Sequence, residues 1–222
     1  MNLSTFLRNF FSLNWSATIG INHAIGGVAM VLRMPVKVYG KLRWSIDGEI
    51  ILPRDAHRGM LMMGSCHEDY TASSGKAQMD IKGKWIVGGD VRIGPDCFIG
   101  VSQGASLTIG DGTFIGRDSQ IHCSGRVNIG RDVFCGETYI CDSTEHRLIH
   151  DGKEKERHGS VTIGDGTYMG FRTMMLKGTV IPPRSVVGSG AVCTKDFSAE
   201  KEKVFIAGVP AEIRRKDCTA VK

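Results

Sequence analysis

The chain has 222 residues, of which 41% are hydrophobic, and 28 Lys and Arg against 23 Asp and Glu give it a net charge of +5. This length fits one domain with small appendages, and the hydrophobic fraction supplies a core but is too low for an integral membrane protein. The positive excess is mild and forms no dense basic stripe or nucleic-acid motif, which argues against nucleic acid and suits a phosphorylated small ligand.

The N-terminal residues predict a short helix. Phe6, Phe10 and Phe11 with Arg8 indicate an amphipathic helix over Met1–Phe11 that packs on the body of the protein, in preference to weak contact with a membrane. The segment lacks the long apolar stretch and the small-residue cleavage site of a signal peptide. No apolar run approaches the ~20 residues that a transmembrane helix needs. We therefore expect no transmembrane segment.

A six-residue repeat begins at Ile81. An aliphatic or similar residue recurs at Ile81, Val87, Ile93 and Ile99, and again in the same register at Ile163, Met169, Met175, Ile181, Val187 and Cys193. A small or β-branched residue stands four positions after the aliphatic one, at Val91, Cys97, Thr113, Ser119, Val133, Thr167, Thr173, Thr179, Ser185 and Ala191. Glycine often follows the aliphatic residue directly.

A period of six fits neither an amphipathic helix, at 3.6, nor a simple alternating strand, at 2. It fits a short strand followed by a tight corner, where glycine tolerates backbone angles that other residues avoid. Because the aliphatic and the small residue are an even number of positions apart, we expect both to point to the same face of an extended chain. Three such units close a triangular coil, and stacked coils bury a continuous column, so the sequence predicts an all-β parallel β-helix.

The hexad register shifts by two residues at three places, between Ile99 and Val101, between Leu107 and Ile109, and between Ile121 and Cys123. A shift of two keeps the inward face inward because the side chains of a strand alternate with a period of two. We interpret the extra residues as additions to the corners.

The seven cysteines, an odd number without a CxxC pair, argue against a disulfide scaffold. Five of them fall within the hexads, at Cys97, Cys123, Cys135, Cys141 and Cys193. We interpret these five as small buried hydrophobes in a protein of the reducing cytoplasm. Because buried thiols are inert, we reject a mechanism with a cysteine nucleophile.

The hexads stop between Cys141 and Val161, where a polar and charged loop interrupts them over residues 142–160. A loop that projects from a rigid solenoid is a common place for function. Within this loop His146 stands four residues after Asp142. The loop alone is as compatible with a solvated histidine as with a catalytic one.

Four stretches carry a resemblance to a known family: residues 163–170 (IGDGTYMG), 176–181 (LKGTVI), 188–195 (GSGAVCTK) and 207–211 (AGVPA). With the sequence around the loop, they resemble the left-handed parallel β-helix acyltransferases that contain hexapeptide repeats. The closest likeness is to the sugar O-acetyltransferases of surface-polysaccharide biosynthesis and to the maltose, galactoside and antibiotic acetyltransferases. The resemblance implies a left-handed coil, whereas the general rule for parallel crossovers predicts a right-handed one.

The resemblance also organises the chain. Residues 35–50 look like the entry strands of polysaccharide-associated members, so we expect a short helix and entry strands over residues 1–45. The β-helix is expected over residues 46–195 and a tail over residues 196–222. The chain departs from the family at Tyr168, where tryptophan is common, at Arg172, where asparagine is frequent, and at Pro182–Pro183, which replaces a Gly-Asp corner.

The resemblance implies that an acetyl group moves from acetyl-coenzyme A to an acceptor hydroxyl, with the loop histidine as general base. His146 matches that position, and imidazole accepts a proton near neutral pH. Asp142 or Glu145 would hold the other ring nitrogen, and the backbone N–H of Gly170 would stabilise the oxyanion. His150 is the competing base, which we interpret as a surface or supporting residue.

The resembling enzymes bind coenzyme A along the C-terminal coils, between neighbouring subunits, so we expect a homotrimer. The contacts implied for the cofactor are Gly170, Gly188, Ser189, Ala191, Thr194, Lys195 and, more weakly, Arg215. Lys195 would place a point charge on a phosphate. The alternative is an ordinary exposed lysine with no role in binding. For the acceptor we propose Glu137 and Tyr168, with an exposed outer-face glutamate as the alternative for Glu137.

Other functions remain open at this level. A sugar hydroxyl is the first choice of acceptor because of the N-terminal resemblance, and the amino group of an amino sugar is the second. A γ-type carbonic anhydrase would hold zinc on three histidines across subunits, for which His122, His146 and His150 are the candidates, but two of these lie on the inserted loop and we expect no metal. A non-catalytic β-helix scaffold would have no need of the Asp142-x-x-x-His146 spacing.

Overall fold

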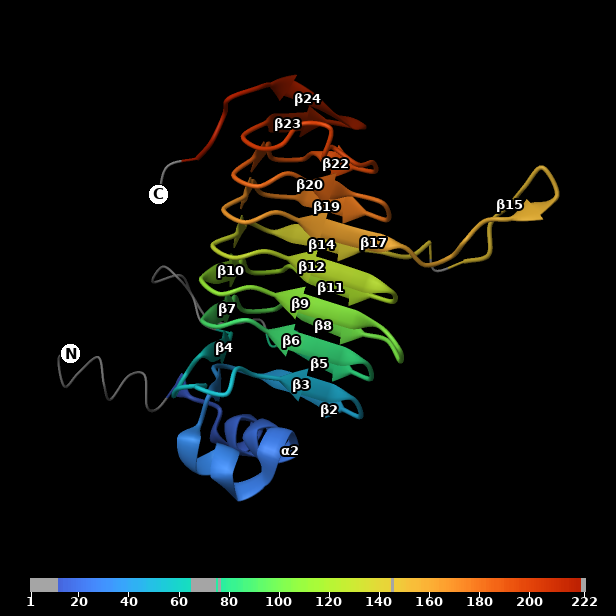
Figure 1. The fold of residues 1–222 in the computed structure, drawn as a ribbon. Helices are drawn as coiled ribbons and strands as arrows, with labels where there is room; N and C mark the ends of the chain where they lie inside the picture. Colours follow the sequence, from blue (N-terminus) through green and yellow to red (C-terminus); the bar gives the residue numbers. More distant parts are fainter. Residues whose placement is uncertain (1–11, 65–74, 76, 145, 221–222) are drawn as a thin grey trace.

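The computed structural model describes residues 12–64, 75, 77–144 and 146–220. The chain winds into a parallel β-helix whose N-terminal end is covered by helix α2 (Trp15–Arg33) (Figure 1). Three long sheets form the faces of the solenoid, and a separate two-stranded sheet stands on an arm that projects to one side. The expected Met1–Phe11 helix lies outside the described residues.

The first face is a nine-stranded sheet of β1 (Val36–Val38), β4 (Leu61–Met63), β7 (Val91–Ile93), β10 (Thr113–Ile115), β13 (Phe134–Cys135), β18 (Tyr168–Met169), β21 (Val186–Val187), β23 (Phe205–Gly208) and β24 (Ala211–Arg215). The second is a seven-stranded sheet of β2 (Leu42–Ile46), β5 (Ala77–Ile81), β8 (Phe98–Val101), β11 (Gln120–Cys123), β14 (Thr138–Cys141), β19 (Thr173–Leu176) and β22 (Val192–Cys193). The third is a six-stranded sheet of β3 (Glu49–Ile51), β6 (Lys84–Val87), β9 (Ser106–Ile109), β12 (Arg126–Ile129), β17 (Ser160–Ile163) and β20 (Val180–Ile181).

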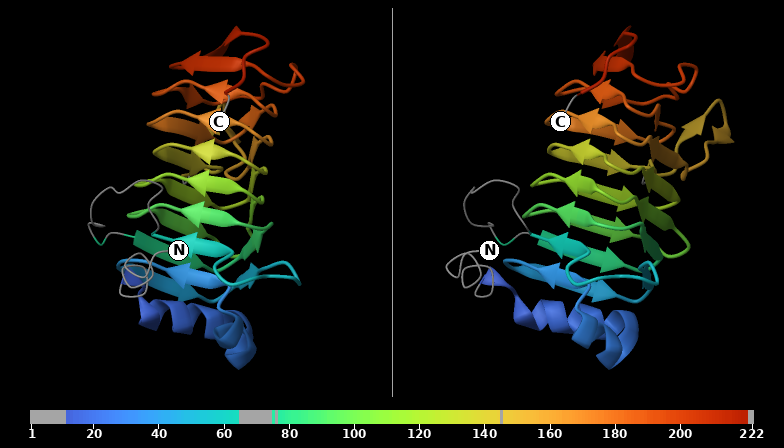
Figure 2. Two further views of the ribbon diagram at one scale, coloured as in Figure 1. Left: turned by 90° about the vertical axis from the view of Figure 1, so that its left-hand side faces the viewer. Right: turned by 60° about the vertical axis from the view of Figure 1, so that its left-hand side comes forward.

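The coils are parallel and left-handed. Every pairing along the three faces is parallel except the terminal β23–β24 hairpin. In the left panel of Figure 2, the strands of the nearest sheet point to the left while the chain climbs from its N-terminal to its C-terminal end, which is the left-handed sense. The expected fold class is confirmed. The coils begin at β1 and continue through β23, on both sides of the expected limits at residues 46 and 195.

Both hexad columns point into the solenoid, as the sequence predicts. The ten aliphatic positions are exposed by 1% or less, and the ten small positions by 2% or less. The reason differs from the one expected, because a corner lies between an aliphatic residue and the small residue four positions later. Val87 ends β6 and Val91 begins β7, whereas Val91 and Ile93 share one strand at a spacing of two.

The register shifts lengthen strands, which corrects the expectation that they lengthen corners. Ile99 and Val101 both lie within β8, and both are buried. A coil of clean hexads takes 18 residues, from Tyr168 to its partner Val186. The coil from Arg92 to Phe114 contains two shifts and takes 22 residues. Because strands alternate with a period of two, the added pair extends the inward column without rotating it.

The inward hydroxyl groups are satisfied by backbone carbonyls. Thr113 Oγ1 donates to Gly130 O at 2.8 Å, and Thr179 Oγ1 donates to Cys193 O at 2.8 Å. A buried hydroxyl without a partner would cost about 1–3 kcal/mol, so these bonds explain why Thr and Ser are tolerated at the small position. The corners themselves use left-handed backbone at Asp96, Asp118 and Arg172, with φ of 61°, 55° and 57°.

Helix α2 begins at the N-cap Asn14, whose Oδ1 accepts from Ala17 N at 3.0 Å. It docks through Asn22, whose amide group donates to Val36 O at 2.8 Å and accepts from Val36 N at 3.1 Å. By length and composition α2 is a candidate membrane span, which corrects the expectation that no apolar run approaches that length. Only 22% of its apolar window is buried.

Candidate functional site

The interruption in the hexads forms an antiparallel arm. Its two strands are β15 (Ile149–His150) and β16 (Lys153–Glu154), and it projects away from the coils (Figure 1). At the base of the arm Ser143 and His158 form an antiparallel bridge, and Thr144 N donates to Arg157 O at 3.1 Å. The arm is therefore a hairpin closed at its root, whose outer part stands clear of the solenoid.

Asp142 fastens the root of the arm to the coil below. Its side chain is fully buried, and its two carboxylate oxygens accept from Ser124 N at 2.7 Å and from Gly125 N at 2.8 Å. Charge-assisted bonds of this kind are about twice as strong as neutral ones. The aspartate four residues before the histidine therefore determines where the arm leaves the solenoid.

His146 lies on the arm, four residues beyond this anchor, and is exposed. Its backbone N–H donates to Thr144 O at 2.6 Å, and Thr144 Oγ1 donates to His146 O at 3.0 Å. These bonds hold its backbone and leave its ring facing solvent. Asp142 directs both oxygens at the coil, and Glu145 lies outside the described residues.

Further contacts stiffen the arm. Arg147 forms two hydrogen bonds to the carboxylate of Glu154, from Nε at 2.9 Å and from Nη2 at 2.8 Å. Lys177 of the next coil donates from Nζ to the backbone carbonyl of Glu156. Exposed ion pairs contribute only about 0.2–1 kcal/mol each, so these bonds orient the arm more than they stabilise the protein.

The backbone N–H of Gly170 is not available for an oxyanion, which corrects the expectation from sequence. It donates to Val187 O of the next coil at 2.8 Å. A Cβ atom at Gly170 would lie 2.6 Å from Ser189 Oγ and 2.7 Å from Ser189 N, so glycine is required there for the coils to stack. Gly188 is used in the same way, since its N–H donates to Ile206 O at 2.8 Å.

The remaining residues expected to contact the cofactor differ in exposure. Ala191 faces the core and is fully buried, so its side chain does not reach a ligand on the outer surface, which corrects that expectation. Four residues are exposed on the last coils: Ser189, Thr194, Lys195 and Arg215. Lys195 Nζ lies 2.7 Å from Glu212 Oε2, and the hydrogen bond from Lys195 lowers the pKa of the Glu212 carboxyl.

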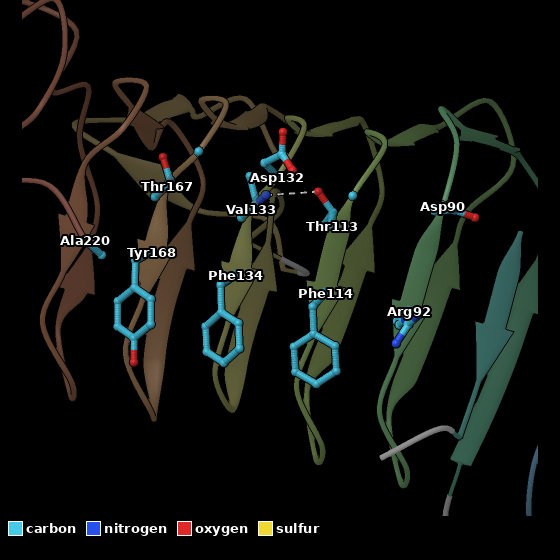
Figure 3. Close-up of a pocket in the computed structure, with 12 residues that line it drawn as sticks. Asp90, Arg92, Thr113, Phe114, Asp132, Val133, Phe134, Thr167, Tyr168 and Ala220 are labelled. Atoms are coloured by element: carbon cyan, nitrogen blue, oxygen red, sulfur yellow. Dashed lines mark hydrogen bonds between the residues drawn. The ribbon is translucent and has the colours of Figure 1, made fainter. Parts of the chain in front are cut away.

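An aromatic row that the sequence analysis missed runs along the nine-stranded sheet. Phe114, Phe134 and Tyr168 stack with ring centroids 5.3 Å and 5.1 Å apart, and Figure 3 shows them side by side. They line a groove of about 580 Å³ bordered by Arg92. The signal was present in the sequence, because each of these aromatics directly precedes an inward residue of the same sheet.

Neither the arm nor the last coils contribute to this groove apart from Ala220 of the tail. Tyr168 belongs to it, whereas Glu137 stands at a corner. There its carbonyl oxygen accepts from Arg172 N at 2.6 Å, and its carboxylate lies 3.5 Å from Arg172 Nε. The two residues proposed for the acceptor are therefore in different surroundings.

The chain matches no profile of a known protein family. It is 32% identical over 166 residues to a probable acetyltransferase of Mycobacterium tuberculosis, an alignment that covers 72% of the chain and 51% of that relative. It is 26% identical over 168 residues to the galactoside O-acetyltransferase of Escherichia coli, covering 74% of the chain and 80% of that protein.

Both relatives bear acetyltransferase names, and the left-handed coil of hexads agrees with the resemblance to the hexapeptide-repeat acyltransferases. The chain spans about half the length of the mycobacterial relative. Among solved structures, the polySia-specific acetyltransferase NeuO superposes with a TM-score of 0.46 at 19% identity, over 85% of this chain and 79% of that one.

The coil cysteines of this protein are buried free thiols. Burial raises the pKa of Cys97, Cys123 and Cys193 to about 12. At neutral pH these thiols are protonated, which agrees with the rejection of a cysteine nucleophile.

The zinc alternative required His122, His146 and His150 to converge. The His122 ring lies in the seven-stranded sheet, between Phe98 at 4.6 Å and Tyr139 at 5.2 Å, while His146 stands on the arm. Over the described part of the chain, no group of three His, Cys, Asp or Glu side chains is placed to hold a metal ion.

Proposed function

We propose that this protein transfers the acetyl group of acetyl-coenzyme A to a hydroxyl group of a sugar-containing acceptor, with His146 as the general base. The observation that carries the proposal is the arm, which presents an exposed histidine from a root fastened to the coil by Asp142. The acetyltransferase names of both sequence relatives support the reaction, and the name of the E. coli protein supports a sugar acceptor.

The reaction needs only one proton carrier. The His146 imidazole accepts the proton of the acceptor hydroxyl while the hydroxyl oxygen attacks the thioester carbonyl carbon. The tetrahedral oxyanion then collapses, the carbon–sulfur bond breaks, and the imidazolium returns its proton to the leaving thiolate. Glu145 is the remaining candidate to orient the ring, because both oxygens of Asp142 are occupied by backbone N–H groups.

Replacement of His146 tests the role of the base. Thiol release from acetyl-coenzyme A should be measured over a panel of sugars, nucleotide-sugars and amino sugars. His146→Ala should lower kcat about 10²- to 10⁴-fold, because the hydroxyl loses its proton acceptor. His158→Ala is the matched control, since it removes an exposed histidine from the same arm. Turnover of His146→Ala at the wild-type rate would refute the mechanism.

We place coenzyme A on the exposed residues of the last coils, with Lys195 and Thr194 at the phosphates. Lys195 already pairs with Glu212, so phosphate and carboxylate compete for one ammonium group. Lys195→Ala should weaken binding of coenzyme A more than binding of dephospho-coenzyme A. Glu212→Gln should strengthen coenzyme A binding by about 1.5- to 5-fold, the value of an exposed ion pair. The proposal requires that Lys195→Ala weakens coenzyme A binding and that Glu212→Gln strengthens it.

We further propose a homotrimer in the cytoplasm, with each arm completing a site on a neighbouring subunit. The exposed apolar side chains of the arm, Leu148 at 50% and Ile149 at 68%, support a covered position in the assembly. The six described cysteines are free, which suits a reducing compartment. Sedimentation equilibrium should give three times the chain mass, and a monomer would contradict this arrangement.

A further inference from the structure

The positive charge of this protein is concentrated at one end. Residues 1–46 contain five Lys and Arg and no Asp or Glu, whereas the rest of the chain holds 23 of each sign. The entire net charge of +5 therefore belongs to the segment that contains α2 and the first two strands. Arg33, Lys41 and Arg43 are exposed, and none of them is in an ion pair within the described ranges.

The same end exposes apolar side chains. Four large residues of α2 are exposed: Trp15 by 36%, Ile19 by 45%, Val28 by 67% and Leu32 by 72%. The outer face of a helix on a soluble protein normally carries charged and polar groups. Here Arg33 is the only charged residue of the 19-residue helix.

The two halves of α2 differ in their packing. The buried residues Ala17, Thr18, Ile21 and Asn22 all lie in the first half, which is tied to β1 through Asn22 and Val36. At Gly26 and Gly27 the backbone leaves the helical conformation, with φ of −168° and 65°. The second half, with Val28 and Leu32, follows this break and directs its apolar side chains outward.

We propose that this end of the protein binds the surface of an anionic lipid bilayer, with α2 lying in the interface. We define the N-terminal surface as Trp15, Ile19, Val28, Leu32, Arg33 and Lys41. Apolar side chains that insert among acyl chains, flanked by basic groups that meet anionic headgroups, are the features of an interfacial helix. Figures 1 and 2 show α2 lying across the end of the solenoid, where a flat surface reaches it without meeting the coils.

The charge distribution decides between a bilayer and a second copy of the chain. Two N-terminal surfaces brought together would oppose two segments of charge +5, whereas an anionic membrane complements that charge. The hydrogen bonds between Asn22 and Val36 favour a helix that remains docked while it lies on the membrane. A helix that crosses the bilayer would have to break them.

Vesicle sedimentation tests the proposal on the full chain. Wild type should bind vesicles of phosphatidylcholine mixed with phosphatidylglycerol, bind pure phosphatidylcholine far more weakly, and dissociate at high salt. Leu32→Glu should weaken binding to the mixed vesicles by on the order of tenfold or more. Lys41→Gln should weaken it about fivefold, the effect of one basic residue near the surface. Val209→Glu is the matched control, because Val209 is exposed by the same 72% at the opposite end of the solenoid.

Each other outcome overturns the proposal. Absence of binding, or equal binding to neutral and anionic vesicles, would remove the electrostatic component. If Leu32→Glu and Val209→Glu lost vesicle binding equally, the loss would be a general effect of the added negative charge. A smaller particle mass for Leu32→Glu without vesicle binding would identify the face as a contact between copies. Retention on vesicles at high salt would indicate a helix inserted across the bilayer.

Discussion

The coils and the arm that interrupts them are held together in different ways. In the coils, each inward side chain is buried and the backbone of each strand pairs with the coils above and below. The arm has one short antiparallel pair, β15 with β16, and its apolar side chains are exposed. The buried carboxylate of Asp142 connects the two regions.

This difference separates the part of the protein that provides stability from the part that carries the proposed catalytic residue. A solenoid gains stability from repetition, because each coil buries the face of its neighbour. A histidine at an inward position of such a coil would be enclosed and unable to meet an acceptor. The arm instead carries the exposed His146 clear of the repeat, and Asp142 gives the root of the arm a defined position.

The largest contrast should appear in thiol reactivity. Because burial raises the pKa of Cys193 to about 12, its thiolate is scarce at pH 8, whereas Cys218 in the tail is partly exposed. Alkylation of the native protein should label Cys218 on the order of 10³-fold faster than Cys193. Peptide mapping by mass spectrometry measures both rates. Equal rates in the folded protein would show that the coils open readily.

Matched leucine truncations compare the two regions directly. Leu107→Ala removes a fully buried coil side chain and should cost about 2–5 kcal/mol of unfolding free energy, since a cavity remains. Leu148→Ala removes a side chain of the arm that is 50% exposed within one chain and should change the unfolding free energy of the dissociated subunit by about 0.5 kcal/mol or less. Denaturant titration of the dissociated subunits gives both values. A large loss for Leu148→Ala under these conditions would mean that the arm packs against its own coils.

The junction should show an intermediate effect. Asp142→Asn places an amide where two backbone N–H groups now meet carboxylate oxygens, and should cost about 1–3 kcal/mol. Because the substitution displaces the arm and with it His146, kcat should fall by more than the loss of unfolding free energy explains. Denaturant titration and turnover should be measured together, with His158→Ala as the control within the arm. Unchanged turnover in Asp142→Asn would show that Asp142 does not position His146.

The smallest effect concerns one corner. Arg172 has a φ of 57°, a left-handed conformation that costs an ordinary residue about 1–2 kcal/mol. Arg172→Asn should therefore stabilise the protein by up to about 1 kcal/mol, less the small contribution of the exposed pair with Glu137. A shift of the thermal midpoint measures it. A destabilised variant would give the Glu137 pair more weight than its exposure suggests.

Much of the fold was predictable because the hexads repeat a local rule. Residues such as Ile93, Met175 and Val187 point inward in each coil for the same reason, so a single sequence contains many copies of the evidence. The periodicity did not reach the first coil, because Val36 and Leu61 begin strands before the repeat becomes regular, and entry strands at residues 35–50 were expected from the resemblance alone. Helix α2 was missed because Gly26 and Gly27 divide its apolar pattern.

The candidate site was predictable only in part. The residue types and the Asp142-x-x-x-His146 spacing identified the arm, but not that Asp142 would direct both oxygens at the coil. Gly170 and Ala191 were assigned to the cofactor for their small size, whereas their small size serves the stacking and filling of the coils.

The sequence by itself determined the solenoid, the inward columns and the place where the repeat breaks, since these follow from periodicity along the chain. Only the tertiary structure decided which polar groups are still available to a ligand. The partners of Asp142, Gly170 and Lys195 come from other coils or from the terminal hairpin, and each lies 17 or 18 residues away along the chain. Such pairings depend on how coils of 18 to 22 residues stack, which no local pattern records.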